Sequence, residues 1–137
     1  MTEQNMKNLD TKIKIITRLH EEEQELIQTM KPLVVSFMGE KDTNALKHTF
    51  VYFDDQKVVR QEVHISSKDL LCQLSLTRVY FVEENGVSLE VSVEIRWADQ
   101  TQHLIYKDIC CYPKTTVKDL CGYIAGILAG ARAIHNR

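Results

Sequence analysis

Apolar residues in the N-terminal part of the chain recur at alternating spacings of four and three, which is typical of an amphipathic helix with a heptad seam. These apolar positions are Leu9, Ile13, Ile16, Ile27 and Met30. His20 and Glu23 occupy the seam positions between Ile16 and Ile27. Because proline disfavours helical geometry at the residue before it, Pro32 is expected to end the helix. We therefore predict one long helix over residues 5–31.

The middle of the chain, residues 33–112, alternates between apolar and polar positions in several short runs, as antiparallel β-strands do. The predicted strands are 48–53, 57–65, 74–84, 87–97 and 101–112. The first two are expected to form a hairpin around Asp54-Asp55-Gln56, although their register is open. The sequence thus predicts an antiparallel β-meander of about four to six strands.

The dipeptide Asn85-Gly86 is the strongest turn signal in the chain, because both residues tolerate the positive φ angles of a type I′ hairpin turn. A turn with these two loop residues sets Glu84 opposite Val87 and Arg78 opposite Val93. One face of the hairpin is then apolar apart from Arg78.

Small residues form one stripe along a predicted C-terminal helix over residues 115–137. The stripe contains Gly122, Ala125, Gly126, Ala129 and Gly130. The opposite stripe is apolar and is expected to pack on the sheet. Each glycine costs about 1 kcal/mol of helix propensity, so a second helix is expected against the small stripe. That helix is either the chain's own N-terminal helix or the same helix of a symmetric copy.

Length and composition place these elements in a single domain of the α+β class over residues 1–137. The net charge of −2, without a basic block, argues against nucleic acid and membrane surfaces as partners. The N-terminus does not resemble a signal peptide, and the four cysteines are too irregularly spaced for a disulfide scaffold. We therefore expect a reducing, cytoplasmic location.

Catalytic and metal-binding motifs receive little support from the residue spacings. Cys72 and Arg78 match the spacing of tyrosine-phosphatase loops, but the intervening residues contain no glycine and alternate as a strand. His103, Cys110, Cys111 and Cys121 lack the paired spacing of a zinc site. We predict no catalytic residues, no metal and no cofactor.

Arg78 is the strongest candidate for a polar site, because an unpaired guanidinium on an apolar face would be costly. Continuing the meander sets Tyr106 opposite Val93 and places Asp108 on the same face, which predicts an internal ion pair with Arg78. Alternatively, Arg78 binds a small anionic ligand between the sheet and a helix, in a pocket lined by Tyr80 and Tyr106.

His20 and Glu23 also have two interpretations. They form a solvated or mutually paired polar layer, or they act as a register device that sets the alignment of helices in an assembly. In the second case, they belong to an interface together with the small-residue stripe.

The sequence best fits a non-catalytic protein–protein interaction or assembly module that self-associates through its helices. The expected partners are further copies, as a homodimer or a higher homo-oligomer, and another protein as an additional partner. The alternative is a protein that binds or sequesters a small anionic ligand around Arg78. An enzyme is the third interpretation, since the motifs indicate no catalytic constellation.

Overall fold

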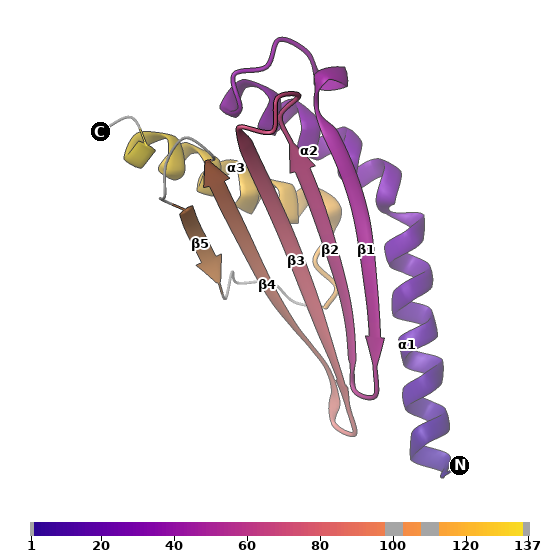
Figure 1. The fold of residues 1–137 in the computed structure, drawn as a ribbon. Coiled ribbons are helices and arrows are strands. Elements are labelled where there is room, and N and C mark those ends of the chain that lie inside the picture. The colour runs from indigo at the N-terminus through magenta and orange to yellow at the C-terminus, as the bar shows by residue number, and fades with distance from the viewer. Residues whose placement is uncertain (1, 98–102, 108–112, 136–137) are drawn as a thin grey trace.

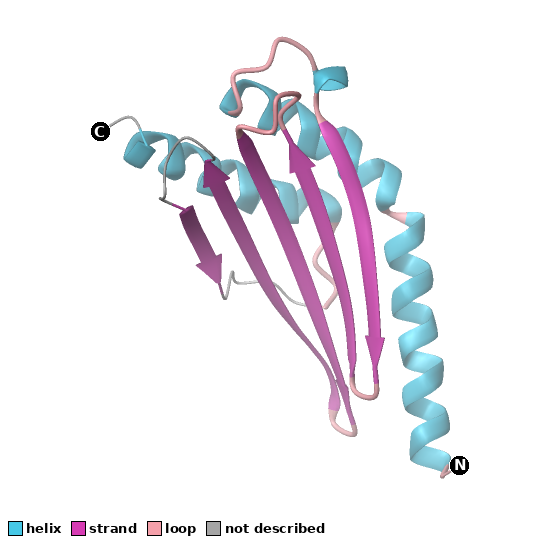
Figure 2. Ribbon diagram, in the orientation of Figure 1, coloured by secondary structure: helices cyan, strands magenta, loops and turns pink. Residues whose placement is uncertain are grey.

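The computed structural model describes residues 2–97, 103–107 and 113–135, and only the backbone of residues 103–107 and 134–135. These residues form three α-helices, a short 3-10 helix and a five-stranded antiparallel sheet (Figures 1 and 2). The predicted α+β class and the antiparallel meander are therefore confirmed.

The predicted N-terminal helix consists of two helices, α1 (Glu3–Glu21) and α2 (Glu23–Phe37), which meet at Glu22. Thr2 begins α1, because its side chain accepts a hydrogen bond from the backbone N–H of Asn5. Figure 1 shows a change of direction between the two helices. A single straight helix is thus the wrong description of this segment.

Pro32 lies inside α2, so the prediction that it ends the helix is wrong. A proline in a helix interior costs about 3 kcal/mol, because it removes a hydrogen bond and crowds the preceding turn. Met30 and Val34 are fully buried on either side of the exposed Pro32, and their burial offsets this cost. The helix continues to Phe37, so residues 33–37 belong to α2 and not to the sheet, whose first strand begins at Lys47, next to the predicted start at residue 48.

The sheet follows the 3-10 helix η1 (Thr43–Ala45). Its strands are β1 (Lys47–Asp55), β2 (Val58–Ser66), β3 (Cys72–Glu83), β4 (Gly86–Trp97) and β5 (His103–Lys107). Each strand pairs antiparallel with the next, in the order β1-β2-β3-β4-β5. The predicted first hairpin is confirmed as β1 and β2, and Val93 lies opposite Tyr106 as predicted.

The register of the β3–β4 hairpin differs from the prediction by two residues. Glu83 pairs with Gly86, so the loop residues are Glu84 and Asn85. Gly86 has a φ of +132°, whereas Asn85 is not among the described residues with positive φ, so a type I′ turn does not form at Asn85-Gly86. Arg78 is consequently opposite Val91 instead of Val93. A shift of two preserves the faces of a strand, so Arg78 still points to the predicted side.

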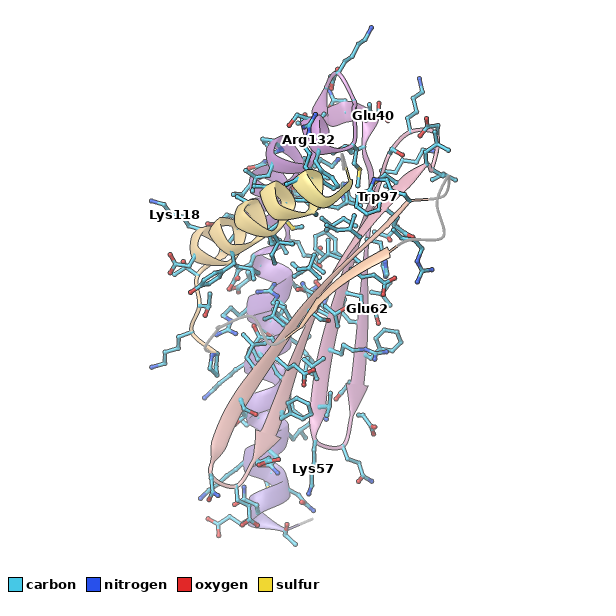
Figure 3. The ribbon with its side chains drawn as sticks, turned by 90° about the vertical axis from the view of Figure 1, so that its left-hand side faces the viewer. Glu40, Lys57, Glu62, Trp97, Lys118 and Arg132 are labelled. Carbon is cyan, nitrogen blue, oxygen red and sulfur yellow. The ribbon has the colours of Figure 1, made fainter. Side chains whose placement is uncertain are left out.

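All three helices cover one face of the sheet (Figure 3). Alternate residues of the central strands are fully buried beneath them, among them Val63, Leu76 and Val93. One core cluster joins this face to α2 and α3 (Val117–His135), and a smaller one joins it to α1. The opposite face of the sheet has no helix against it in Figure 3.

The predicted C-terminal helix is confirmed as α3, which begins after Thr116. The Thr116 hydroxyl accepts a hydrogen bond of 3.1 Å from the backbone N–H of Asp119. Leu120, Ile124 and Leu128 point into the core from this helix. None of the helices in the described part of the chain is long and apolar enough to cross a membrane.

Candidate functional site

Arg78 is a buried cation on the helix-facing side of β3, with 2% of its surface exposed. Its Nε and Nη2 donate hydrogen bonds of 2.9 and 2.6 Å to Oε1 of Gln61, the residue opposite it on β2. Nη1 lies 3.9 Å from Oε2 of Glu22, at the junction of the two helices. The protein's own polar groups therefore hold this guanidinium.

Gln61 extends the contact to β1 and to the helices. Its Nε2 donates a hydrogen bond of 3.1 Å to the hydroxyl of Tyr52, which donates one of 2.5 Å to Oε1 of Glu23. The same carboxylate oxygen lies 2.8 Å from Nδ1 of His20, whose ring centroid is 4.2 Å from that of Tyr52. His20 and Glu23 thus form the mutual pair that their spacing indicated.

Tyr52 is a fixed hydrogen-bond donor in this arrangement. Burial, followed by the hydrogen bond to Glu23, raises the pKa of Tyr52 to about 12. Its hydroxyl therefore remains protonated at neutral pH and cannot serve as a base there. The arrangement suits structural pairing of the Glu23 carboxylate better than proton transfer.

Arg18 of α1 makes a second contact between the helices and the sheet, with Tyr80 of β3. Its Nη2 donates a hydrogen bond of 3.1 Å to the hydroxyl of Tyr80, and its Nε lies 3.4 Å from Oε1 of Glu22. We call the whole set the junction network: it comprises Arg18, His20, Glu22, Glu23, Tyr52, Gln61, Arg78 and Tyr80. The network joins the break between α1 and α2 to three neighbouring strands.

Gln61 is the main member of the junction network that we did not predict. A signal for it exists, because Gln61 interrupts the buried row formed by Val59, Val63 and Ile65, just as Arg78 interrupts its own row. Two polar interruptions in neighbouring apolar rows indicate a buried polar pair. The undefined register of β2 prevented this inference from the sequence.

The structure brings Arg78 and Tyr80 to one face, as predicted, but it turns them to different neighbours. An open cleft of about 440 Å³ lies beside Tyr80, between α1 and the sheet. Its lining residues are Ile15, Arg18, Tyr80, Val87, Pro113 and Lys114. Arg78 is not among them. Tyr106 lies on β5, but its side chain and all of Asp108 fall outside the described residues.

The two cysteines in the described part of the chain, Cys72 and Cys121, are both buried. Cys72 and Arg78 lie along one extended strand, so they do not form the curled loop that holds a phosphate. On α3, burial raises the pKa of Cys121 to about 11, despite the opposing effect of Arg78. Among the described residues, no group of three or more His, Cys, Asp or Glu is arranged to hold a metal ion.

The three glycines of α3 point away from the rest of the described chain. A Cβ atom built at Gly122, Gly126 or Gly130 would meet no described atom within 4 Å. The second half of the predicted N-terminal helix, α2, lies beside Ala125 and Ala129, so the chain's own helix covers one margin of the predicted groove and leaves the glycines uncovered. Nη1 of Arg132 donates a hydrogen bond of 3.4 Å to the backbone oxygen of Ser36 in α2.

We define the small-residue face of α3 as Gly122, Gly126, Ala129, Gly130 and Ala133, all of which are exposed. At about 100° per residue these positions lie opposite the buried stripe of the helix. The face consists of glycine and alanine only. The nearest charged residues on α3 lie outside it, because Lys118 and Asp119 precede the face and Arg132 turns toward α2. Figure 3 shows Lys118 and Arg132 toward the two ends of α3. An exposed helix surface without charge resembles the centre of a protein interface.

Neither a protein-family model nor a curated protein nor a solved structure matches this chain. The functional argument therefore depends on the residues and geometry described above.

Proposed function

We infer that the protein is a non-catalytic assembly module that self-associates through the small-residue face of α3. The observation that carries this proposal is that three glycines, four residues apart on one helix face, contact no other described part of the chain. Nothing described within the monomer requires them to lack a side chain.

The energetic argument concerns the propensity cost of these glycines. Each glycine in a helix interior is about 1 kcal/mol less favourable than alanine, so the three together weaken α3 considerably. A contact that brings another backbone close to the helix would offset this loss, because glycine permits the nearest approach. A copy of α3 offers the same flat, uncharged surface, and a twofold axis brings the two surfaces together.

The junction network supports a non-catalytic role. Three of its contacts cross the helix–sheet boundary: Tyr52 donates to Glu23, Arg18 donates to Tyr80, and Arg78 lies near Glu22. This geometry fixes the position of α1 and α2 on the sheet, which is what an assembly module needs for a rigid surface.

Sedimentation velocity over a range of concentrations tests the proposal with two leucine variants. Gly126→Leu places a branched side chain at the centre of the small-residue face, and the expected result is a folded chain whose assembly has a lower mass than that of the wild type. Lys14→Leu adds a leucine to the exposed side of α1 and should sediment like the wild type. A wild type that remains monomeric, or a Gly126→Leu variant that associates normally, would contradict the proposal.

A second candidate function is the binding of a small anion in the cleft beside Tyr80. The observation in its favour is that Arg18 and Lys114 both line this cleft, next to an apolar floor of Ile15 and Val87. Native mass spectrometry of protein purified from cells tests it, since a retained anionic molecule lost in Arg18→Met would support it and a bare chain would not.

A further inference from the structure

The outer edge of β1 is long and uncovered. β1 contains nine residues, and among the described residues it pairs only with β2 and accepts no backbone hydrogen bond from any other element. Proteins protect edge strands with proline, bulges, short length or central charges. The central segment Thr49–Phe53 contains no proline and no charge, and its pairing with β2 is continuous.

Apolar side chains flank this edge on the face of the sheet away from the helices. Val51 is 36% exposed and Phe53 is 44% exposed. The guanidinium carbon of Arg60 lies 4.2 Å from the ring centroid of Phe53 and covers one side of it. The remaining surface of these side chains is available to a neighbour at the edge.

Apolar residues also flank the edge on the helix side, along α1. Met6, Leu9 and Ile13 are 60%, 45% and 53% exposed. At about 100° per residue, Leu9 and Ile13 share a stripe with His20. Because the ring of His20 stacks on Tyr52 of β1, this stripe lies on the β1 side of the helix. Figure 1 shows α1 running alongside β1.

We propose that a second copy of this chain pairs with the edge, β1 antiparallel to β1, around a twofold axis at Val51. Val51 is the middle residue of the strand, so this register uses its full length. The two sheets then become one continuous sheet, with the helices of both copies on the same side. This contact is separate from the small-residue face of α3 and does not depend on it.

Charge complementarity is the reason for choosing a second copy as the occupant. In this register Lys47 lies opposite Asp55 of the copy, which supplies one pair of opposite charges. His48 lies opposite Asp54, whose carboxylate already pairs with Lys12 of its own chain, so this position adds no charge pair. Phe50 faces Tyr52 of the copy on the helix side of the sheet. Opposite charges and aromatic pairs directly across an antiparallel ladder are stabilising, and the twofold axis makes each pair occur twice. No like charges face each other.

Lys12 of α1 contacts Asp54 and Asp55, so the exposed Leu9 and Ile13 lie toward that end of β1. In the paired register they therefore face the Lys47 end of the copy's β1, not the corresponding residues of its α1. A chain that uses both this edge and the small-residue face of α3 has two twofold contacts and can assemble beyond a dimer.

Cysteine cross-linking tests the register directly, with mild oxidation followed by peptide mapping. Residues directly opposite in an antiparallel pair are about 4.5–5.5 Å apart between Cα atoms, which suits a disulfide. Val51→Cys should therefore link to itself. Thr49→Cys should not, because its copy lies about 13 Å along the strand. Mixing Thr49→Cys with Phe53→Cys should restore a link. A Val51→Cys chain without a self-link, or an equal self-link for Thr49→Cys, would overturn the proposal.

Sedimentation separates this edge from the small-residue face of α3. Val51→Lys sets two lysines against each other at the twofold axis and should lower the mass of the assembly, while Ser88→Lys, an exposed position on β4, should not. If Val51→Lys assembles like the wild type while Gly126→Leu dissociates, the edge proposal is wrong and the proposed function stands. If Gly126→Leu retains the links at Val51→Cys, the edge contact is independent of α3.

Discussion

Arg78 donates two hydrogen bonds to a single oxygen, Oε1 of Gln61, and the two residues face each other across β2 and β3. Both are buried, with 2% and 0% of their surface exposed. Each is a polar residue in an otherwise apolar row. The pair therefore acts as one structural unit, because removal of either partner leaves the other buried without the hydrogen bonds that join them.

A double-mutant cycle measures this unit. Arg78→Met should lower the free energy of unfolding by about 2–4 kcal/mol, since it leaves the carbonyl of Gln61 buried and unpaired. Adding Gln61→Leu should recover about 1–3 kcal/mol of that loss. Urea denaturation gives both values. Additive effects of the two substitutions would show that the hydrogen bonds contribute nothing beyond packing.

The same cycle with Asp108→Leu tests the ion pair predicted from the sequence. If Asp108 pairs with Arg78, the loss in Arg78→Met should be partly recovered in the double variant, as for a buried pair. If the effects of Arg78→Met and Asp108→Leu on the free energy of unfolding add up, Asp108 does not pair with Arg78, and Gln61 and Glu22 are its partners.

Tyr52→Phe removes one donor and one acceptor from the junction network and should destabilise the protein by about 1–2 kcal/mol at neutral pH. The pKa of Tyr52 is raised from 10.0 to about 12 in the folded protein. Its contribution is therefore fully present below pH 10 and is lost as the pH rises through about 12. Denaturation at several alkaline pH values should show the difference between wild type and variant shrinking over that window. A constant difference would contradict the assignment.

Pro32→Ala should raise the free energy of unfolding by about 1–3 kcal/mol, because it removes a steric conflict in the interior of α2. Pro32 is exposed, so the substitution creates no cavity. Thermal unfolding followed by circular dichroism checks the prediction. A lower melting temperature would mean that the proline is accommodated without strain.

The elements that the sequence predicted best have long periodic patterns. The alternation from Val87 to Trp97 placed the apolar face of β4 correctly, and the apolar stripe opposite the small residues placed α3 on the sheet. The face of Arg78 followed from the same alternation. The predicted side of Arg78 is correct despite the error of two residues in register, because side chains alternate between the faces of a strand with a period of two.

The misplaced features depended on local signals that tertiary packing overrides. Pro32 is a strong helix terminator, but the burial of Met30 and Val34 holds α2 together past it. The Asn85-Gly86 signal correctly predicted the β3–β4 hairpin but not its register, because of these two residues only Gly86 adopts a positive φ. The pairing of Gln61 with Arg78 could not be predicted from the sequence. The connection between β2 and β3 contains no short turn motif that would set the register of these two strands.

Gly126→Ala provides the most direct test of self-association through α3, because the proposal predicts opposite effects on two quantities. The added methyl group meets no described atom within 4 Å, so the isolated chain should gain about 0.5–1 kcal/mol in helix stability. In a close contact between two copies of α3, the same methyl group should weaken association. Unfolding at low concentration and sedimentation equilibrium on the same sample measure both. A more stable chain with weaker association is the predicted result, and a more stable chain with unchanged association would contradict the proposal.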